Sequence, residues 1–305
     1  MAPQLLTDVE TPTEIDISHL VIEDDKPVDN LQSARQQRFF VQTLYDSDAI
    51  AQPFLAETNV GLFYNLKEDP IVPDVMLSLG VQHAEDYSQK KNRSYFVWEM
   101  GKLPEVCIEI VSNREGDEVN ISRKSQRKGK TVSKKDRYAR IGIQYYIVFD
   151  PLDQIQSDMG YSKVKVWTRS VDSDYPETLA QSINNIGEFI WLDQVEIGLT
   201  LWHGEFEESI SRVWLRWCDI NGNVILTGSE RAKIADRQAK LADDRARIAD
   251  RRVEIADRRA EQEKTLAQNE RIRAEEEQTR AESAEAKSQR LADRLRSMGI
   301  NPDEM

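Results

Sequence analysis

Two acidic residues interrupt apolar stretches of this 305-residue sequence, where a carboxylate is costly. The stretch LPEVCIEIVSN, residues 103–113, alternates as a β-strand does with apolar residues on both faces, and Glu109 breaks that pattern. Asp74 breaks a second apolar run, IVPDVMLSLGV. Two such acids on adjacent strands would repel each other unless a divalent cation lay between them, and Mg²⁺ is the simplest candidate. For each acid alone, the alternative is a strand-end side chain that faces solvent.

The segment that follows these acids is strongly basic, although the whole chain has a net charge of −13. Between residues 123 and 140 there is a single acid, Asp136. The cations of this segment are Arg123, Lys124, Arg127, Lys128, Lys130, Lys134, Lys135, Arg137 and Arg140. The total charge argues against a general nucleic-acid binder, but a local cluster of this kind suits phosphate groups. A solvated basic loop is the alternative.

Other common catalytic motifs fail on spacing. The segment RKGKT resembles the end of a phosphate-binding loop, but Lys124 stands where the first glycine of that motif belongs. His19, His83 and His203 are too scattered for a structural zinc site. Neither a nucleophile elbow nor a dinucleotide-binding fingerprint is present.

The elements that must position the acids follow from the periodicity of residues 29–228. Helical spacing predicts a helix from about residue 31, with Asp29 or Asn30 as its N-cap, and Ser133 and Gly142 bound a second, short helix. Strand-like runs occupy residues 53–65, 71–81, 94–100, 105–112, 144–150, 162–170, 188–193 and 197–209. This order predicts an α/β fold with a mixed central sheet.

The two ends of the chain differ from this domain in composition. Residues 1–28 are acidic and predict a loosely ordered arm. Residues 229–298 contain neither Gly nor Pro and predict one long helix, with a short tail at 299–305.

The long helix carries a seven-residue repeat, visible in RAKIADR and its successors. Alanines recur in steps of three and four at Ala232, Ala235, Ala239, Ala242, Ala246 and Ala249. A strict seven-residue repeat indicates a left-handed coiled coil, so we expect a homo-oligomer and in the first instance a dimer. The alternative is a lone charged helix held by i,i+4 pairs such as Asp236 with Lys240.

Cysteine usage and hydropathy bear on the compartment. Cys107 and Cys218 lie far apart in apolar or aromatic surroundings, so we expect buried free thiols in a reducing environment. No apolar run approaches the roughly 18 residues that span a bilayer, and the N-terminus lacks a signal-peptide pattern. We therefore expect a soluble, cytoplasmic protein without a membrane partner.

The ordered combination of segments resembles a known family. VPDVMLSLGV, then SYFVWEMGKLPEVCIEIVSNREGDE, then KKDRYARIGIQYYIVFDP is similar to a bacterial restriction-endonuclease family of the PD-(D/E)XK nuclease superfamily. The resemblance extends over about residues 30–297, including the segment 199–230 and the charged helical tail. It implies a restriction-endonuclease-like core and hydrolysis of DNA phosphodiester bonds with Mg²⁺, for which Mn²⁺ could substitute.

The resemblance also implies roles for particular residues. Asp74 matches the first metal-binding acid and Glu109 the second, and the backbone carbonyl of Ile110 would complete the set. The signature position for the catalytic lysine holds Val111. The lysine that this family places on the following helix, four residues before a tyrosine, is Lys134.

Three departures from the family pattern matter. About a dozen extra residues precede Lys134, so Lys124 is a second candidate for the catalytic lysine. Where some members carry a first-helix acid, this chain offers Gln32. The residues expected to contact DNA are Arg123, Lys124, Arg127, Lys128, Lys130 and Lys135. Two alternatives stay open: a nuclease-like fold that binds nucleic acid without cutting it, and a scaffold whose working part is the long helix.

Overall fold

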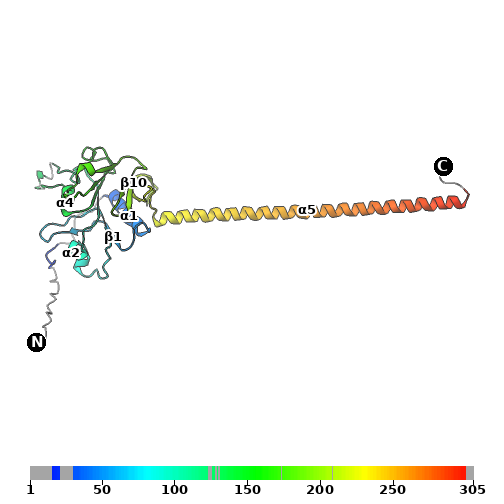
Figure 1. The fold of residues 1–305 in the computed structure, drawn as a ribbon, viewed down its shortest axis with the longest axis horizontal. Coiled ribbons are helices and arrows are strands. Elements are labelled where there is room, and N and C mark those ends of the chain that lie inside the picture. The colour runs from blue at the N-terminus through cyan, green and yellow to red at the C-terminus, as the bar shows by residue number, and fades with distance from the viewer. Residues whose placement is uncertain are drawn as a thin grey trace, which may run out of the picture. The chain divides into compact units, whose positions relative to one another are not determined.

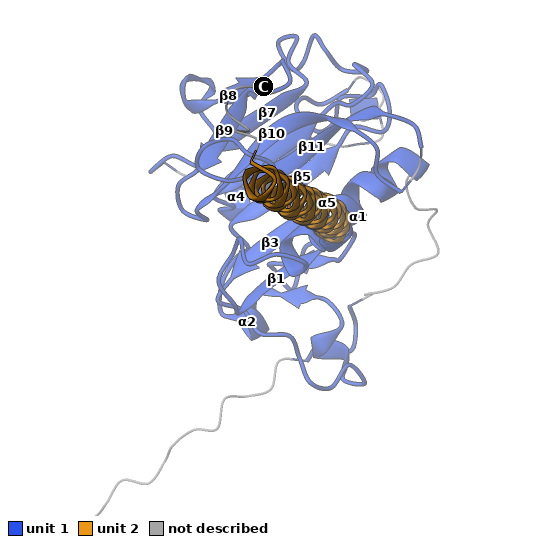
Figure 2. Cartoon of the chain, turned by 90° about the vertical axis from the view of Figure 1, so that its right-hand side faces the viewer, with its two compact units in different colours: residues 1–231 blue, residues 232–305 orange. Residues whose placement is uncertain are grey.

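The structure is a computed structural model that describes residues 16–20, 30–122, 126–127, 129, 131–172, 174–207 and 209–299. It divides into two compact units, Met1–Arg231 and Ala232–Met305 (Figure 2). The predicted arm at residues 1–28 lies outside the described residues except for 16–20.

The first unit contains a mixed six-stranded sheet with the order β1-β3-β5-β6-β7-β8. Figure 1 shows the ribbon of this unit, with β1, β10 and the helices α1, α2 and α4 labelled. Its strands are β1 (Phe54–Glu57), β3 (Val75–Leu79), β5 (Val106–Ile110), β6 (Tyr145–Phe149), β7 (Val164–Thr168) and β8 (Gln181–Ile183). Only β5 and β6 run parallel among these neighbours, and helix α4 (Lys134–Ile141) lies in the connection between them. The predicted α/β fold with a mixed sheet is confirmed.

A second, three-stranded antiparallel sheet has the order β11-β10-β9. Its strands are β9 (Phe189–Leu192), β10 (Ile197–Gly204) and β11 (Arg212–Cys218). These strands share one apolar core with helix α1 (Leu31–Tyr45) and with Val106, Ile108 and Ile110 of β5. The other side of β5 packs with α4 in a separate cluster that contains Cys107 and Val111. Glu109 therefore points toward the α4 side, because alternate residues of a strand share a face.

Helix α1 begins and docks through polar contacts. The Asn30 side chain accepts hydrogen bonds from the backbone N–H groups of Gln32 and Ser33, so the predicted N-cap is confirmed. The buried Gln36 side chain donates to the Leu215 carbonyl at 2.7 Å and accepts from the Leu215 N–H at 3.1 Å. This two-way bond fixes the rotation of α1 against β11.

One sequence prediction was wrong in part. Residues 94–100 were expected to form a strand, but only β4 (Tyr95–Phe96) is extended, and it pairs in parallel with β2 (Leu62–Phe63). The remainder is a helical turn, α2 (Val97–Met100), that ends at Gly101 with φ +73°. A left-handed residue at this position favours glycine and stops the helix. Short 3₁₀ turns, η1 (Lys90–Asn92) and η2 (Glu177–Leu179), complete the unit, and Cys107 and Cys218 are buried free thiols, as expected.

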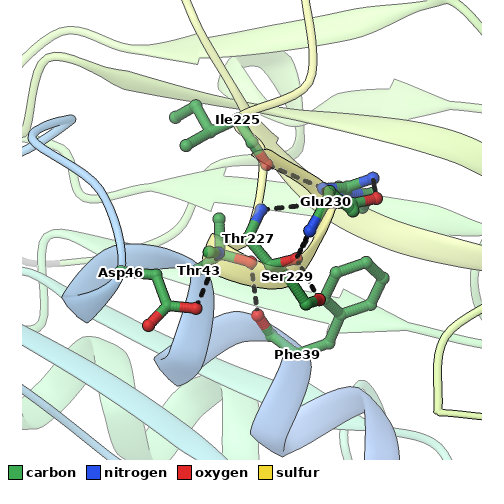
Figure 3. Close-up of polar contacts among 9 residues, drawn as sticks. Phe39, Thr43, Asp46, Ile225, Thr227, Ser229 and Glu230 are labelled. Atoms are coloured by element: carbon green, nitrogen blue, oxygen red, sulfur yellow. Dashed lines mark hydrogen bonds and ion pairs between the residues drawn. The ribbon is translucent and has the colours of Figure 1, made fainter. Parts of the chain in front are cut away.

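The long helix α5 (Gly228–Ser297) begins with a capping box (Figure 3). The Thr227 N–H donates to the Glu230 carboxylate at 2.9 Å, and the Glu230 N–H donates to the Thr227 hydroxyl at 3.3 Å. The Gly228 N–H is satisfied by the Asp46 carboxylate at 2.8 Å. The predicted long C-terminal helix is confirmed, and its first turn is tied to the first unit by these bonds.

Glu230 also holds the most deeply buried cation of this region. Arg216, 2% exposed, donates to both carboxylate oxygens of Glu230, at 2.9 and 2.7 Å. Its guanidinium lies 4.5 Å from the ring centre of Phe39 and 4.6 Å from that of Trp202. Burial of an arginine is tolerable only with such partners. Hydrogen bonds from Arg216 and Thr227 lower the pKa of Glu230 and outweigh the raising effect of its burial.

Beyond its first turn α5 is solvent-exposed within the described residues, including the repeated Ile234, Leu241, Ile248 and Ile255. The pair Asp236 with Lys240, the example given for a lone charged helix, does not form; the ion pairs between described residues of this helix are i,i+3 pairs such as Arg247 with Asp244. Among the described residues, no helix combines the length and the apolar character needed to cross a bilayer.

Replacement of Arg216 by Met should destabilise the first unit by about 3–5 kcal/mol, because Glu230 would lose its paired cation in a partly buried setting. Urea denaturation followed by tryptophan fluorescence measures this loss. The control is Arg247→Met, which removes an exposed ion pair and should change stability by less than about 1 kcal/mol. Equal effects of the two substitutions would contradict the assignment of Arg216 as a structural anchor.

Candidate active site

The sheet register brings the two predicted acids together. Strands β3 and β5 are antiparallel, with Val75 opposite Ile108, so the same register places Asp74 opposite Glu109. The Ile110 N–H donates to an Asp74 oxygen at 2.6 Å. Asp74 is 9% and Glu109 1% exposed, so neither is the solvent-facing strand-end acid of the alternative interpretation.

A residue that sequence reasoning missed lies beside Asp74. The Gln37 side chain of α1 donates to the other Asp74 oxygen at 3.3 Å, and Asn59 donates to Gln37 at 2.8 Å. Gln32, which was considered for the first-helix position, is a partly exposed residue in the first turn of α1. The available signal was the spacing of Ser33, Gln37 and Phe40, which places a glutamine on the buried stripe of the helix.

Glu109 is compensated by partners from α4. The Lys134 ammonium lies 2.6 Å from one carboxylate oxygen, and the Tyr138 hydroxyl donates to the other at 2.8 Å. Burial lowers the pKa of Lys134, but the charge of Glu109 and the hydrogen bond to it raise this pKa above its usual value overall. Burial raises the pKa of Tyr138, which keeps its proton available for donation. Lys134 therefore supplies positive charge that was expected to come from a divalent ion.

The start of α4 explains how Lys134 reaches Glu109 across the extra basic residues. Ser133 is the N-cap and accepts from the Asp136 N–H at 3.1 Å, as predicted. The Lys134 N–H donates to the Asp117 carbonyl at 2.9 Å, and the Lys135 N–H donates to the Glu118 carbonyl at 3.1 Å. These two backbone bonds hold the start of α4 next to Asp117 and Glu118. The extra residues before Lys134 therefore do not move it away from Glu109.

A cavity of about 180 Å³ opens where these elements meet. It is lined by Asp74, Glu109, Ile110, Ser112, Asn113, Glu115, Asp117, Glu118 and Lys134. Five of these residues carry carboxyl groups and one carries an ammonium group, so the lining is strongly acidic. Three of the five acids belong to the sequence NREGDEV, which was not recognised as part of the site.

The donor set suits a hard cation. Carboxylate and carbonyl oxygens are the ligands that Mg²⁺ takes, and Mg²⁺ is often held by one or two carboxylates while it keeps several waters. Asp74, Glu109 and the backbone of Ile110 line the cavity and meet this description. Within the described residues there is no group of three or more His, Cys, Asp or Glu side chains arranged around a single ion position.

The predicted DNA-contacting residues are only partly described. Four of them lie outside the described residues, namely Arg123, Lys124, Lys128 and Lys130. The structure therefore does not test Lys124 as a second candidate for the catalytic lysine. Arg127 is exposed. Lys135 does not face the cavity: its ammonium lies 3.2 Å from Glu177 and 5.4 Å from the centre of the Trp167 ring.

Comparison with models of known protein families gives no match for this chain, and a comparison with curated proteins gives none either. The geometry of the cavity therefore has to carry the functional argument.

Substitution of Lys134 by Met should destabilise the protein by roughly 1–3 kcal/mol or more, because the buried Glu109 would lose its charged partner. A second substitution, Glu109→Gln, should recover part of that loss, since it removes the unpaired charge. Lys163→Met, which breaks a more exposed pair with Asp153, is the control and should cost less than about 1 kcal/mol. Chemical denaturation of the wild type, the two single variants, the double variant and the control measures these differences; additive losses in the double variant would contradict the pairing.

Proposed function

We propose that the chain is a Mg²⁺-dependent endonuclease that hydrolyses phosphodiester bonds of DNA, as the resemblance to restriction endonucleases of the PD-(D/E)XK superfamily implies. One observation carries the proposal: Asp74, Glu109 and Lys134, which the resemblance singles out from three separate segments, line one small acidic cavity. Mn²⁺ would replace Mg²⁺, because both accept carboxylate and carbonyl oxygens.

Each residue has a part that its contacts support. A bound divalent cation would polarise the phosphodiester and make an attacking water more acidic. Asp74 is oriented for binding by the Ile110 N–H and by Gln37, and Glu109 is oriented by Tyr138. Lys134 brings a permanent positive charge into the cavity, where it would offset negative charge that develops on the phosphoryl oxygens.

The basic residues of the segment after Glu118 would contact neighbouring phosphates without reading the base sequence. Binding of DNA should therefore weaken steeply as the salt concentration rises.

A second candidate function is supported by the same contacts. Gln37 stands next to Asp74 where a first-helix acid would add a further ligand, and Lys134 already compensates Glu109. Both features suit a nuclease-like protein that binds nucleic acid without cutting it. Such a protein would show salt-dependent DNA binding that is indifferent to Mg²⁺.

The two buried free cysteines support a reducing, cytoplasmic location.

Supercoiled plasmid should be nicked by the wild-type protein with Mg²⁺ or Mn²⁺ and left intact with EDTA. Asp74→Asn and Glu109→Gln should each reduce nicking by at least about 10²-fold, because each removes a charge that the cation requires. Glu85→Gln alters an exposed acid outside the cavity and serves as the control with unchanged activity. Undiminished nicking by the Asp74 and Glu109 variants would refute the assignment.

We further propose that α5 pairs with a second copy of itself in parallel. On one side of its alanine seam Asp236, Asp243, Asp250 and Asp257 recur every seven residues, and on the other side lie Arg245, Arg252 and Arg259. None of these charged side chains forms an ion pair within the described part of the chain. In a parallel pair Arg245 would face the partner's Asp250, whereas an antiparallel pair over this segment would align like charges.

Charge reversal tests this pairing. The double variant Arg245→Glu, Arg252→Glu should dissociate at least tenfold more readily than the wild-type protein in sedimentation equilibrium at low salt. Adding Asp250→Arg and Asp257→Arg should restore association, because the pairs reform with exchanged signs. A wild-type chain that stays monomeric at micromolar concentration would contradict the parallel pair and favour a lone charged helix.

A further inference from the structure

Glu118 is a buried acid of the cavity that neither the sequence nor the resemblance assigned to any role. It is 6% exposed, and it lines the cavity together with Asp74, Glu109 and Lys134. One of its carboxylate oxygens, Oε2, is buried and has no hydrogen-bond partner. A buried carboxylate oxygen without a partner is costly, so its retention calls for a reason.

Among the described residues, none donates a hydrogen bond that would explain why this oxygen is buried. The structural bonds of the residue run through its backbone: its carbonyl accepts from the Lys135 N–H at 3.1 Å and from the Tyr146 hydroxyl at 2.8 Å. The side chain could be neutral without disturbing either bond. Burial raises the pKa of Glu118, and the charges of Glu109 and Asp117 add to this, while Lys134 opposes it.

The cavity has the size and charge for a hydrated ion near Glu118. Its volume of about 180 Å³ is well above the roughly 10–15 Å³ that a single water needs, so an ion with several waters has room there. Five acidic residues and one lysine line the cavity, so a divalent cation would reduce the repulsion among the acids. Since no three acidic side chains among the described residues surround one ion position, a third carboxylate can act only through a water of the ion.

We propose that Glu118 is a third acidic group of the cation site, with its carboxyl group turning to accept a hydrogen bond from a water of a divalent cation that Asp74 and Glu109 hold. The inference rests on the proposed function for the position of the cation, and it assigns Glu118 as a positioning residue. Residues that hydrogen-bond a ligand of a metal ion, and not the ion itself, typically alter the affinity for the ion by about 10- to 100-fold.

Binding of Mn²⁺, measured by loss of the free-ion signal in electron paramagnetic resonance and by competition with Mg²⁺, tests this role without any DNA. Glu118→Gln should weaken Mn²⁺ binding at least tenfold. The matched control is Glu57→Gln, which removes the same charge from a partly buried residue outside this cavity and should change binding by less than about threefold. Equal losses in both variants would overturn the specific role of Glu118.

Thermal unfolding in EDTA at pH 8 separates this role from a structural one. Glu118→Gln should leave the melting temperature unchanged or higher, because a buried charge is removed, and should reduce the rise in melting temperature that Mg²⁺ produces in the wild-type protein. A lower melting temperature in EDTA would mean that the carboxylate serves the fold and would overturn the proposal.

The outcomes for Glu118 and for the proposed function are distinguishable. If Asp74→Asn and Glu109→Gln lose Mn²⁺ while Glu118→Gln binds it normally, the inference about Glu118 fails and the cation site stands. If Glu118→Gln loses Mn²⁺ but the wild-type protein never nicks plasmid DNA, the nuclease assignment fails and Glu118 stands. If the wild-type protein binds no Mn²⁺, both fail.

Discussion

The ion pair between Glu109 and Lys134 is the interaction on which the rest of this domain depends. A carboxylate that is 1% exposed in the middle of a strand can be kept only if a cation is brought to it. Because Lys134 is that cation, α4 has to lie against β5 with its first turn next to the carboxyl end of the strand, where Glu109 is. Tyr138 follows one turn later and completes the bonding of Glu109.

The two faces of β5 divide the tasks of the domain. Val106, Ile108 and Ile110 belong to the apolar core shared with α1 and the three-stranded sheet. The opposite face carries the apolar Cys107 and the acidic Glu109 of the site. On that face Tyr138 stacks on Tyr146, with ring centres 4.8 Å apart. Helix α1 joins the two tasks, because Gln36 docks it on β11 and Gln37 on the next position bonds Asp74. Such packing holds polar groups at fixed positions before any ligand arrives.

The sequence made the acids visible for a physical reason. Asp74 and Glu109 interrupt apolar runs, and a break in such a run is detectable without any structure. Lys134 was indicated by the family resemblance, which implies a lysine four residues before a tyrosine, a separation of about one helical turn. Gln37 and Glu118 were not recognised as site residues from the sequence. A glutamine on a helix and an acid in the loop NREGDEV have neighbours in the sequence that are typical of surface positions. Their burial comes from chain segments far away, which periodicity does not report. The turn at residues 97–100 was misassigned because Tyr95, Phe96, Val97 and Trp98 favour strands by type, while Gly101 closes a helical turn.

The bond between the Asp117 carbonyl and the Lys134 N–H, at 2.9 Å, closes a loop whose two ends coincide. For such a loop the entropy of closure grows only with the logarithm of its length, so each doubling costs about 0.6 kcal/mol. The length of the loop between Val119 and the N-cap Ser133 can therefore change with little effect on the cavity. The position of Lys134 next to Glu109 is in this sense independent of the length of the basic segment that precedes it.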